Sequence, residues 1–170
     1  MAEHRQEDVA VVVPVYNEEK TVAGVIESLL DRGYRVIAVD DGSRDSTPEI
    51  LAGIASERDG LSVYTHVINR GLGTALRTGL RAAVDEGASC IVTFDADGQH
   101  DTIDVCKVAS ALIDHRDEMI LGVRDFSQSN VPWRSLFGNR VTSLLIYLFF
   151  GYKIEDTQTG LRGIPKKELE

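Results

Sequence analysis

The sequence has few cysteines and no long apolar run. Only Cys90 and Cys106 are cysteines among its 170 residues, and they lack the paired spacing of a zinc site or a disulfide framework. We therefore expect two buried free thiols. The first eight residues have no apolar core of the kind found in secretory signals. The cytoplasm is the expected location, and peripheral contact with the cytoplasmic face of a membrane is left open.

Basic residues are also scarce relative to acidic ones. The chain has 18 Lys and Arg against 27 Asp and Glu, which gives a formal net charge of -9. Because binding to a nucleic-acid backbone depends on clustered Lys and Arg, this balance argues against nucleic acid as a partner. An anionic substrate would need a metal ion or local arginines to offset the repulsion.

The apolar residues, 43% of the chain, follow two alternating patterns. Continuous β-branched runs predict buried strands, and stripes at helical spacing predict helices. Strands are expected at 9–13, 36–39, 61–67, 90–94 and 119–123, with helices starting near 22, 47 and 72 and another through 105–112. This alternation predicts one α/β domain over residues 1–170, with a mostly parallel sheet and helices on both faces.

Several local details are predicted with these elements. Thr47 is placed to cap its helix, with Pro48 at the first helical position. The helix starting at Leu72 is expected to pack one face onto the sheet, through Leu72, Ala75, Leu76, Leu80 and Ala83. The glycines of the segment 69–73 are attributed to close helix packing. His66 shows no partner in the sequence.

Polar segments follow three of the predicted strands: 14–18, 40–43 and 95–99. Ligands of parallel α/β sheets bind outside the carboxyl ends of the strands, so the three loops are expected to line one cleft. A carboxylate such as Asp41 can accept the imino hydrogen of uracil or of guanine. The ring of Tyr16 offers a stacking face, and Glu18 can accept hydroxyl hydrogens. The alternative is structural: a turn at Asp41, and a helix-start charge at Glu18.

Asp95 and Asp97 stand one residue apart in the segment FDADGQHD. Two carboxylates after a buried strand can hold Mg²⁺ or Mn²⁺, and Gln99 adds a neutral oxygen ligand. A divalent cation would stabilise the charge on a departing diphosphate. A plain surface turn is the alternative, because Asp and Gly favour tight bends.

Five segments together resemble the family-2 glycosyltransferases of the GT-A fold, in their polyprenyl-phosphate, dolichol-phosphate mannose synthase-like branch. They are VVVPVYNEEKTV, VDDGSRDST, NRGLGTALRTGL, FDADGQH and DTQTGLRG. The resemblance implies an inverting transfer from a nucleoside-diphosphate sugar. It also implies that Pro14, Tyr16, Glu18, Val39 and Asp41 hold the nucleotide, that Asp95, Asp97 and Gln99 hold the metal, and that Arg162 approaches the donor.

The acceptor is expected to bind after the metal loop. Guanidinium groups suit phosphate oxygens, and in the resembling branch arginines matching Arg124 and Arg134 hold a lipid phosphate. Solvated surface charges are the alternative. The apolar stretch 144–150 is too short to span a bilayer, so it is a core helix or an interfacial one. Asp156 is placed to act as a base or to orient the acceptor.

These expectations define one main hypothesis. It is a glycosyltransferase that moves a hexose from a UDP- or GDP-sugar to a polyprenyl phosphate, with Asp97 and Asp156 as catalytic residues. Membrane-surface contact or a membrane-protein partner is a further expectation. Two rivals are an enzyme with a soluble or protein hydroxyl acceptor and a non-catalytic nucleotide-sugar-binding module. Relatives usually continue beyond the last motif, so the chain is expected to be a C-terminally shortened catalytic domain.

Overall fold

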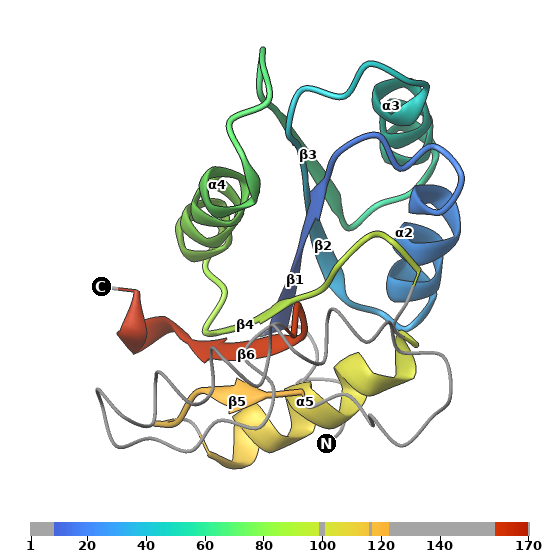
Figure 1. Cartoon of the computed structure of the whole chain (residues 1–170). Coiled ribbons are helices and arrows are strands. Elements are labelled where there is room, and N and C mark those ends of the chain that lie inside the picture. Colours follow the sequence, from blue (N-terminus) through green and yellow to red (C-terminus); the bar gives the residue numbers. More distant parts are fainter. Residues whose placement is uncertain (1–8, 99–100, 116, 123–158, 170) are drawn as a thin grey trace, which may run out of the picture.

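The computed structural model describes residues 9–98, 101–115, 117–122 and 159–169 (Figure 1). Strands and helices alternate along most of this part of the chain, as the sequence predicts. The elements in chain order are β1 Val9–Val15, α2 Val22–Asp31, β2 Arg35–Asp40, α3 Thr47–Glu57, β3 Leu61–Thr65, α4 Leu72–Asp85, β4 Cys90–Thr93, α5 Ile103–Asp114, β5 Ile120–Leu121, β6 Arg162–Pro165 and the short 3₁₀ helix Lys166–Glu168.

Six strands form one sheet in the order β3-β2-β1-β4-β6-β5. The pairs β1–β2, β1–β4 and β2–β3 are parallel, whereas β6 is antiparallel to both β4 and β5. The predicted α/β class and mostly parallel sheet are therefore confirmed. The order reverses beside β1, because β2 and β3 lie on one side of it and β4 lies on the other.

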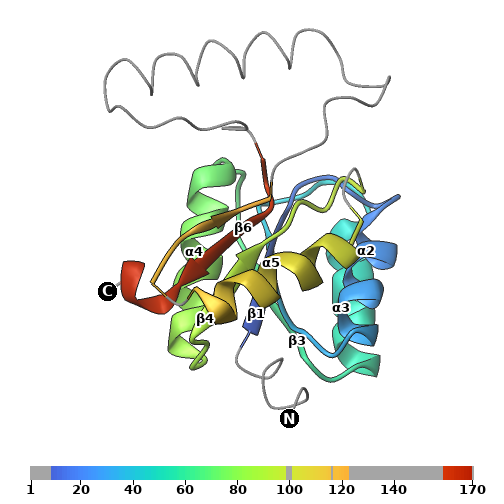
Figure 2. The same cartoon turned by 90° about the horizontal axis from the view of Figure 1, so that it is seen from below.

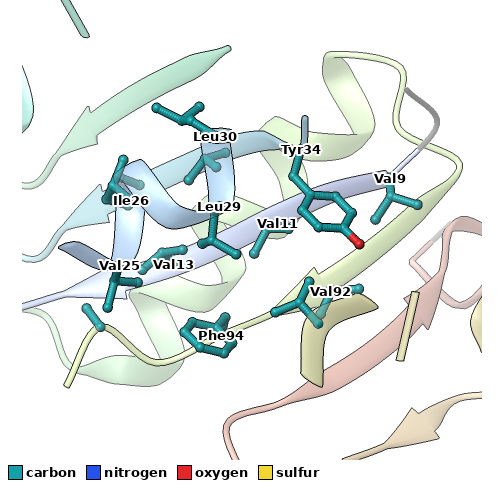
Figure 3. Close-up of a cluster of buried hydrophobic side chains, with 14 of the residues drawn as sticks. Val9, Val11, Val13, Val25, Ile26, Leu29, Leu30, Tyr34, Val92 and Phe94 are labelled. Carbon is teal, nitrogen blue, oxygen red and sulfur yellow. The ribbon is translucent and has the colours of Figure 1, made fainter. Parts of the chain in front are cut away.

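Alternate residues of β1 serve two apolar layers. Val9, Val11 and Val13 pack in the layer that contains α2, α3 and α5, and Ala10 and Val12 pack with α4 on the opposite face. Figure 3 shows the first layer, where side chains of α2 meet β1 and Phe94. Figures 1 and 2 show α4 on one face of the sheet and α2 and α3 on the other. Because both faces are covered, β1 needs the continuous apolar run that the sequence shows.

Strand β1 continues through Pro14, although the sequence predicts that it ends there. The Phe94 N–H donates to the Val12 carbonyl at 3.0 Å, so Val12 points its main-chain groups toward β4. The main-chain nitrogen of Pro14, two residues later, faces the same side of β1. The β1–β4 ladder stops at Val12, so the missing N–H of Pro14 costs no ladder bond.

The structure corrects three local predictions. Helix α3 has Ser46 at its N-cap, but the Ser46 side chain makes no capping hydrogen bond. Asp45 acts instead, because its Oδ1 accepts the Thr47 N–H at 3.1 Å. Strand β3 ends at Thr65, two residues earlier than predicted. Leu72 is exposed and does not join the packed face of α4.

The two cysteines are both free, as expected, but they differ in burial. Cys90 is buried in β4, whereas Cys106 in α5 is only partly buried. The prediction of two buried thiols is therefore correct for Cys90 alone.

Gly79 lets α4 approach the sheet closely. A Cβ at this position would lie 2.4 Å from Val12 Cγ1 and 3.1 Å from Val39 Cγ2, both on buried strands. We therefore expect Gly79→Ala to reduce the free energy of unfolding by about 1–3 kcal/mol, as overpacked cores do. Urea denaturation followed by circular dichroism measures this change.

Gly53 provides the matched control, because it lies inside α3 and a Cβ there meets no atom within 4 Å. Gly53→Ala should stabilise the chain by about 0.5–1 kcal/mol through helix propensity alone. Equal stabilisation by both substitutions would contradict the close packing at Gly79.

Candidate functional site

The three polar loops lie at the carboxyl ends of β1, β2 and β4, which are adjacent in the sheet. Chain connections leave β1 toward β2 and leave β4 toward the other edge of the sheet. This is the switch point where open α/β sheets bind ligands. The structure therefore confirms that the three strands before these loops end side by side at one edge of the sheet.

The loops after β1 and β2 are joined by reciprocal hydrogen bonds. The Asn17 N–H donates to Ser43 Oγ at 2.9 Å, and the Arg44 N–H donates to Asn17 Oδ1 at 2.8 Å. Asn17 has φ 54°, in the left-handed region that asparagine tolerates better than most residues. This conformation lets one residue bond to the facing loop through both its main chain and its side chain.

A second set of bonds continues this junction. The Glu18 N–H donates to Thr47 Oγ1 at 2.9 Å, which is the actual role of the threonine expected to cap α3. The Glu19 N–H donates to Asp45 Oδ2 at 3.2 Å, and Glu19 Oε2 accepts the Ser46 N–H at 3.1 Å. The acidic side chains of Glu19 and Asp45 therefore stabilise the two loops through these hydrogen bonds.

Tyr16 and Glu18 keep functional groups outside this network. The Tyr16 side chain is 42% exposed at the end of β1, so its ring face is open to a ligand. Glu18 is partly buried, and its Oε2 accepts the Thr21 hydroxyl at 2.9 Å. The other carboxylate oxygen retains acceptor capacity for a ligand hydroxyl.

Asp41 is a buried carboxylate that anchors the loop after β3. Its Oδ1 lies 2.6 Å from His66 Nδ1 and accepts the Arg70 N–H at 3.0 Å, and its Oδ2 accepts the Gly71 N–H at 2.7 Å. On the far side of the ring, His66 Nε2 lies 3.0 Å from Thr78 Oγ1 in α4. One anion thus fixes both ends of the loop 66–71 and ties it to α4.

This arrangement overturns two sequence expectations. His66 does have a partner, Asp41, which lies 25 residues earlier in the chain. The glycines at 71 and 73 do not serve close packing, because a Cβ at either would meet no atom within 4 Å. Gly71 instead has φ 88°, a conformation that favours glycine and aims its N–H at Asp41.

The pKa of Asp41 is lowered from its ordinary value of 3.8. Burial alone raises the pKa of a carboxyl group, but the hydrogen bonds from His66, Arg70 and Gly71 favour the ionised form and outweigh it. The ionised side chain is therefore built into the fold.

Asp40, the last residue of β2, carries an unsatisfied oxygen. Its Oδ1 accepts the Ser43 N–H at 3.0 Å. Its Oδ2 is buried and has no hydrogen-bond partner in the part of the chain that the structure describes. A buried acceptor without a donor is costly, so a water molecule or ligand N–H that reached Oδ2 would be held there.

Pro14 and Val39 are both buried within their strands. The Val39 side chain lies on the α4 face, close to Gly79. The two side chains therefore belong to the core, and any contact of these residues with a nucleotide would come from their main chain.

Asp95 and Asp97 follow β4, and a glycine from the end of the chain lies against the first of them. A Cβ at Gly160 would stand 1.8 Å from Asp95 Oδ2, so any other residue would force the Asp95 carboxylate to move. The Gly160 carbonyl also accepts the Thr93 hydroxyl at 2.7 Å. These contacts join the segments FDADGQH and DTQTGLRG, which lie far apart in the sequence.

The two carboxylates fit a hard divalent cation. Asp95 and Asp97 are both partly buried at the end of β4, and both supply the oxygen donors that Mg²⁺ and Mn²⁺ prefer. Within residues 9–98, 101–115, 117–122 and 159–169 no group of three His, Cys, Asp or Glu side chains gathers around a point.

Arg162 opens β6 and pairs with Thr93, so it lies beside the end of β4. Its Nε donates to the Thr159 carbonyl at 2.9 Å, which orients the guanidinium group. The structure therefore brings Arg162 to the same edge of the sheet as Asp95. Gln99, Arg124, Arg134, Asp156 and the stretch 144–150 lie outside the described residues.

Sequence reasoning missed four residues of this site: His66, Thr78, Asp45 and Gly160. His66, Thr78 and Gly160 act through contacts with residues distant in the chain, which no local pattern reveals. Asp45 had a local signal, because it stands two residues before the first residues of α3, where an acceptor can reach a free N–H.

The family model for glycosyl transferase family 2 matches residues 10–168. A UDP-N-acetylglucosamine–dolichyl-phosphate N-acetylglucosaminyltransferase of Methanococcus voltae is 34% identical over 175 aligned positions, which cover 94% of this chain and 70% of that protein. Across several curated relatives the chain spans between 48% and 72% of their length.

Two solved structures share the fold. A mannosyltransferase of Pyrobaculum calidifontis, in complex with GDP-Man and Mn²⁺, has a TM-score of 0.60 and 25% identity, covering 71% of this chain and 36% of that one. A glucosyl-3-phosphoglycerate synthase of Mycobacterium tuberculosis has a TM-score of 0.68 and 20% identity, covering 98% of this chain and 59% of that one. With the fold, the arrangement of the loops and the match over residues 10–168 in agreement, the chain belongs to glycosyl transferase family 2 and has its GT-A fold.

Proposed function

We propose that this chain is the catalytic part of a metal-dependent glycosyltransferase that moves a hexose from a nucleoside-diphosphate sugar to a polyprenyl phosphate, with inversion at the anomeric carbon. The observation that carries the proposal is the contact of Gly160 with the Asp95 carboxylate at the switch point. It draws Arg162 toward a pair of carboxylates suited to a divalent cation. A relative 34% identical, named for transfer to dolichyl phosphate, supports the acceptor class.

The donor would lie across the carboxyl ends of β1, β2 and β4. Tyr16 offers an exposed ring on which a base or ribose can stack, and Glu18 offers a carboxylate oxygen to ribose hydroxyls. The base would face the Asp40–Asp41 pair at the end of β2. Binding assays with a panel of UDP- and GDP-sugars would identify the donor.

Asp95, Asp97 and Gln99 would hold the cation. When bound, Mg²⁺ or Mn²⁺ supplies charge stabilisation for a departing diphosphate. Arg162 adds a guanidinium group at the same edge, which suits phosphate oxygens. Arg124 and Arg134 would bind the acceptor phosphate, which is already anionic. For this reason Asp156 is proposed to orient the acceptor, and a separate general base is not needed.

Asp97→Asn tests the metal-binding role. The substitution keeps the size of the side chain but removes its charge, so we expect the affinity for a nucleoside diphosphate with Mn²⁺ to fall at least about tenfold. Affinity without Mn²⁺ should stay the same. Isothermal calorimetry with and without Mn²⁺ measures both values.

Asp114→Asn is the control for charge, because Asp114 is exposed at the far end of α5. It should bind the nucleotide as the parent chain does. If Asp97→Asn kept the full Mn²⁺-dependent affinity, the segment FDADGQHD would be a turn with no metal role.

Asp41→Ala tests the nucleoside side of the site. The change removes an acceptor next to the proposed base and releases the loop 66–71, so nucleotide affinity should fall even without metal. Because the pKa of Asp41 is lowered, its carboxylate stabilises the fold above pH 3.8 and loses this effect as the pH falls through the folded-state pKa. The free energy of unfolding should therefore drop by about 1.5–3 kcal/mol at pH 7, and the deficit should shrink in acid.

His66→Gln separates the two roles of Asp41, because it loosens the loop and leaves the carboxylate in place. It should reduce stability while retaining most of the nucleotide affinity. If only Asp40→Asn lowered the metal-free affinity, the base contact would belong to Asp40, whose Oδ2 lacks a donor in the described structure.

Arg134→Ala tests the acceptor. Loss of a charge-assisted hydrogen bond to phosphate should weaken acceptor binding by about 1.5–3 kcal/mol, which raises the concentration of polyprenyl phosphate needed for transfer. Donor binding and slow donor hydrolysis should not change. Transfer assays with a short polyprenyl phosphate and Mn²⁺ measure these quantities.

Arg58→Ala is the matched control, since Arg58 is ion-paired with Asp31 on the α2–α3 side, away from the site. Unchanged acceptor dependence in both Arg134→Ala and Arg124→Ala would reject a lipid phosphate and favour a soluble acceptor.

A further inference from the structure

The loop between β3 and α4 carries the most exposed apolar side chains of the described residues. Val67 is 98% exposed, Ile68 is 68% exposed and Leu72, at the start of α4, is 58% exposed. We define these three side chains as the apolar tip. Soluble proteins expose single apolar residues routinely, but two adjacent residues as exposed as Val67 and Ile68 favour an interaction site.

The loop that carries this tip is held firmly. Asp41 accepts the main-chain N–H groups of Arg70 and Gly71 and contacts His66, so both ends of the loop are fixed to one buried carboxylate. Gly42 has φ 74°, and a Cβ there would lie 2.6 Å from the Ile68 carbonyl carbon, so the backbone of this loop lies directly against the loop after β2. A buried carboxylate therefore holds the loop in the conformation that exposes Val67 and Ile68 to solvent.

The segment that carries the tip is basic, although the whole chain is acidic. Residues 66–84 contain three arginines and no Asp or Glu, in a chain whose net charge is -9. Arg70, Arg77 and Arg81 are all exposed. Arg70 lies in the loop itself, whereas Arg77 and Arg81 lie further along α4. Apolar side chains next to an exposed arginine suit the interface of anionic membranes.

The position of the tip agrees with such a contact. The loop projects at the top of Figure 1, from the same edge of the sheet as the loops after β1 and β2. A surface that met the tip would therefore face the edge where the donor and the acceptor are proposed to meet. The near-complete exposure of Val67 argues against a place in the donor cleft, because a residue that lined a cleft would be partly covered.

We propose that the apolar tip, with Arg70 beside it, docks this chain onto an anionic lipid surface. Val67, Ile68 and Leu72 would enter the headgroup region and Arg70 would meet a lipid phosphate. No helix in the described ranges is long and apolar enough to cross a bilayer. The inference rests on the proposed function only for its purpose, which is to bring a lipid-borne phosphate to the site.

Flotation of the 170-residue chain with acceptor-free vesicles tests the proposal. Vesicles of phosphatidylglycerol and phosphatidylcholine are compared with vesicles of phosphatidylcholine alone. We expect the parent chain to bind the anionic vesicles, and Val67→Ser with Ile68→Ser to lower the partition coefficient by about tenfold. Both side chains are exposed, so thermal unfolding should not change.

The matched control is Ile103→Ser with Met119→Ser, which removes two exposed apolar side chains elsewhere. This variant should bind the vesicles as the parent does. Equal binding by parent and tip variant, no binding by either, or equal binding to the uncharged vesicles would overturn the proposal.

Two further measurements assign the tip to another partner if the proposal fails. A loss of nucleotide affinity in the tip variant would place Val67 and Ile68 in the donor site. If the tip variant had a lower molecular mass than the parent chain in sedimentation, the tip would be a contact between copies of the chain. Donor binding is measured without vesicles, so a failure of docking can be distinguished from a failure of the proposed function.

Discussion

The site depends on one buried carboxylate, that of Asp41. An anion taken out of water is stable only when donors surround it, and here the donors come from His66 and from the main chain at Arg70 and Gly71. The Asp41 N–H in turn donates to the Val15 carbonyl at 2.8 Å. The carboxyl ends of β1 and β2 and the start of α4 are therefore fixed relative to one another through a single residue.

The loops around Asp41 are rigid for the same reason. Asn17 and Glu19 each bond to the facing loop, so the segments after β1 and β2 behave as one unit. A site that is ordered before its ligand arrives loses less conformational entropy on binding. Much of the acidic character of these motifs thus serves the order of the site.

The sequence predicts the parts of this protein that depend on neighbours in the chain. Periodicity identified the strands and helices, and the placement of polar segments after strands identified the edge where the site lies. It could not reveal that His66 bonds to Asp41, that Thr47 serves the loop after β1 or that Gly160 lies against Asp95, because these contacts join residues 25 or more positions apart. Leu72 shows the opposite limit, since it fits the apolar stripe of α4 but is exposed at the first residue of the helix.

The antiparallel strand β6 has a consequence for the order of folding. The chain makes β4 about 70 residues before the strand that pairs with its free side, and long loops close slowly. During synthesis β1 to β4 can assemble first, with β4 as an unprotected edge open to pairing with other chains. Only when residues 160–165 emerge does Gly160 reach Asp95 and the edge close. The surroundings of Asp95 are therefore among the last features to mature, so a ribosome-bound nascent chain would carry the proposed nucleotide site before it carried the complete proposed metal site.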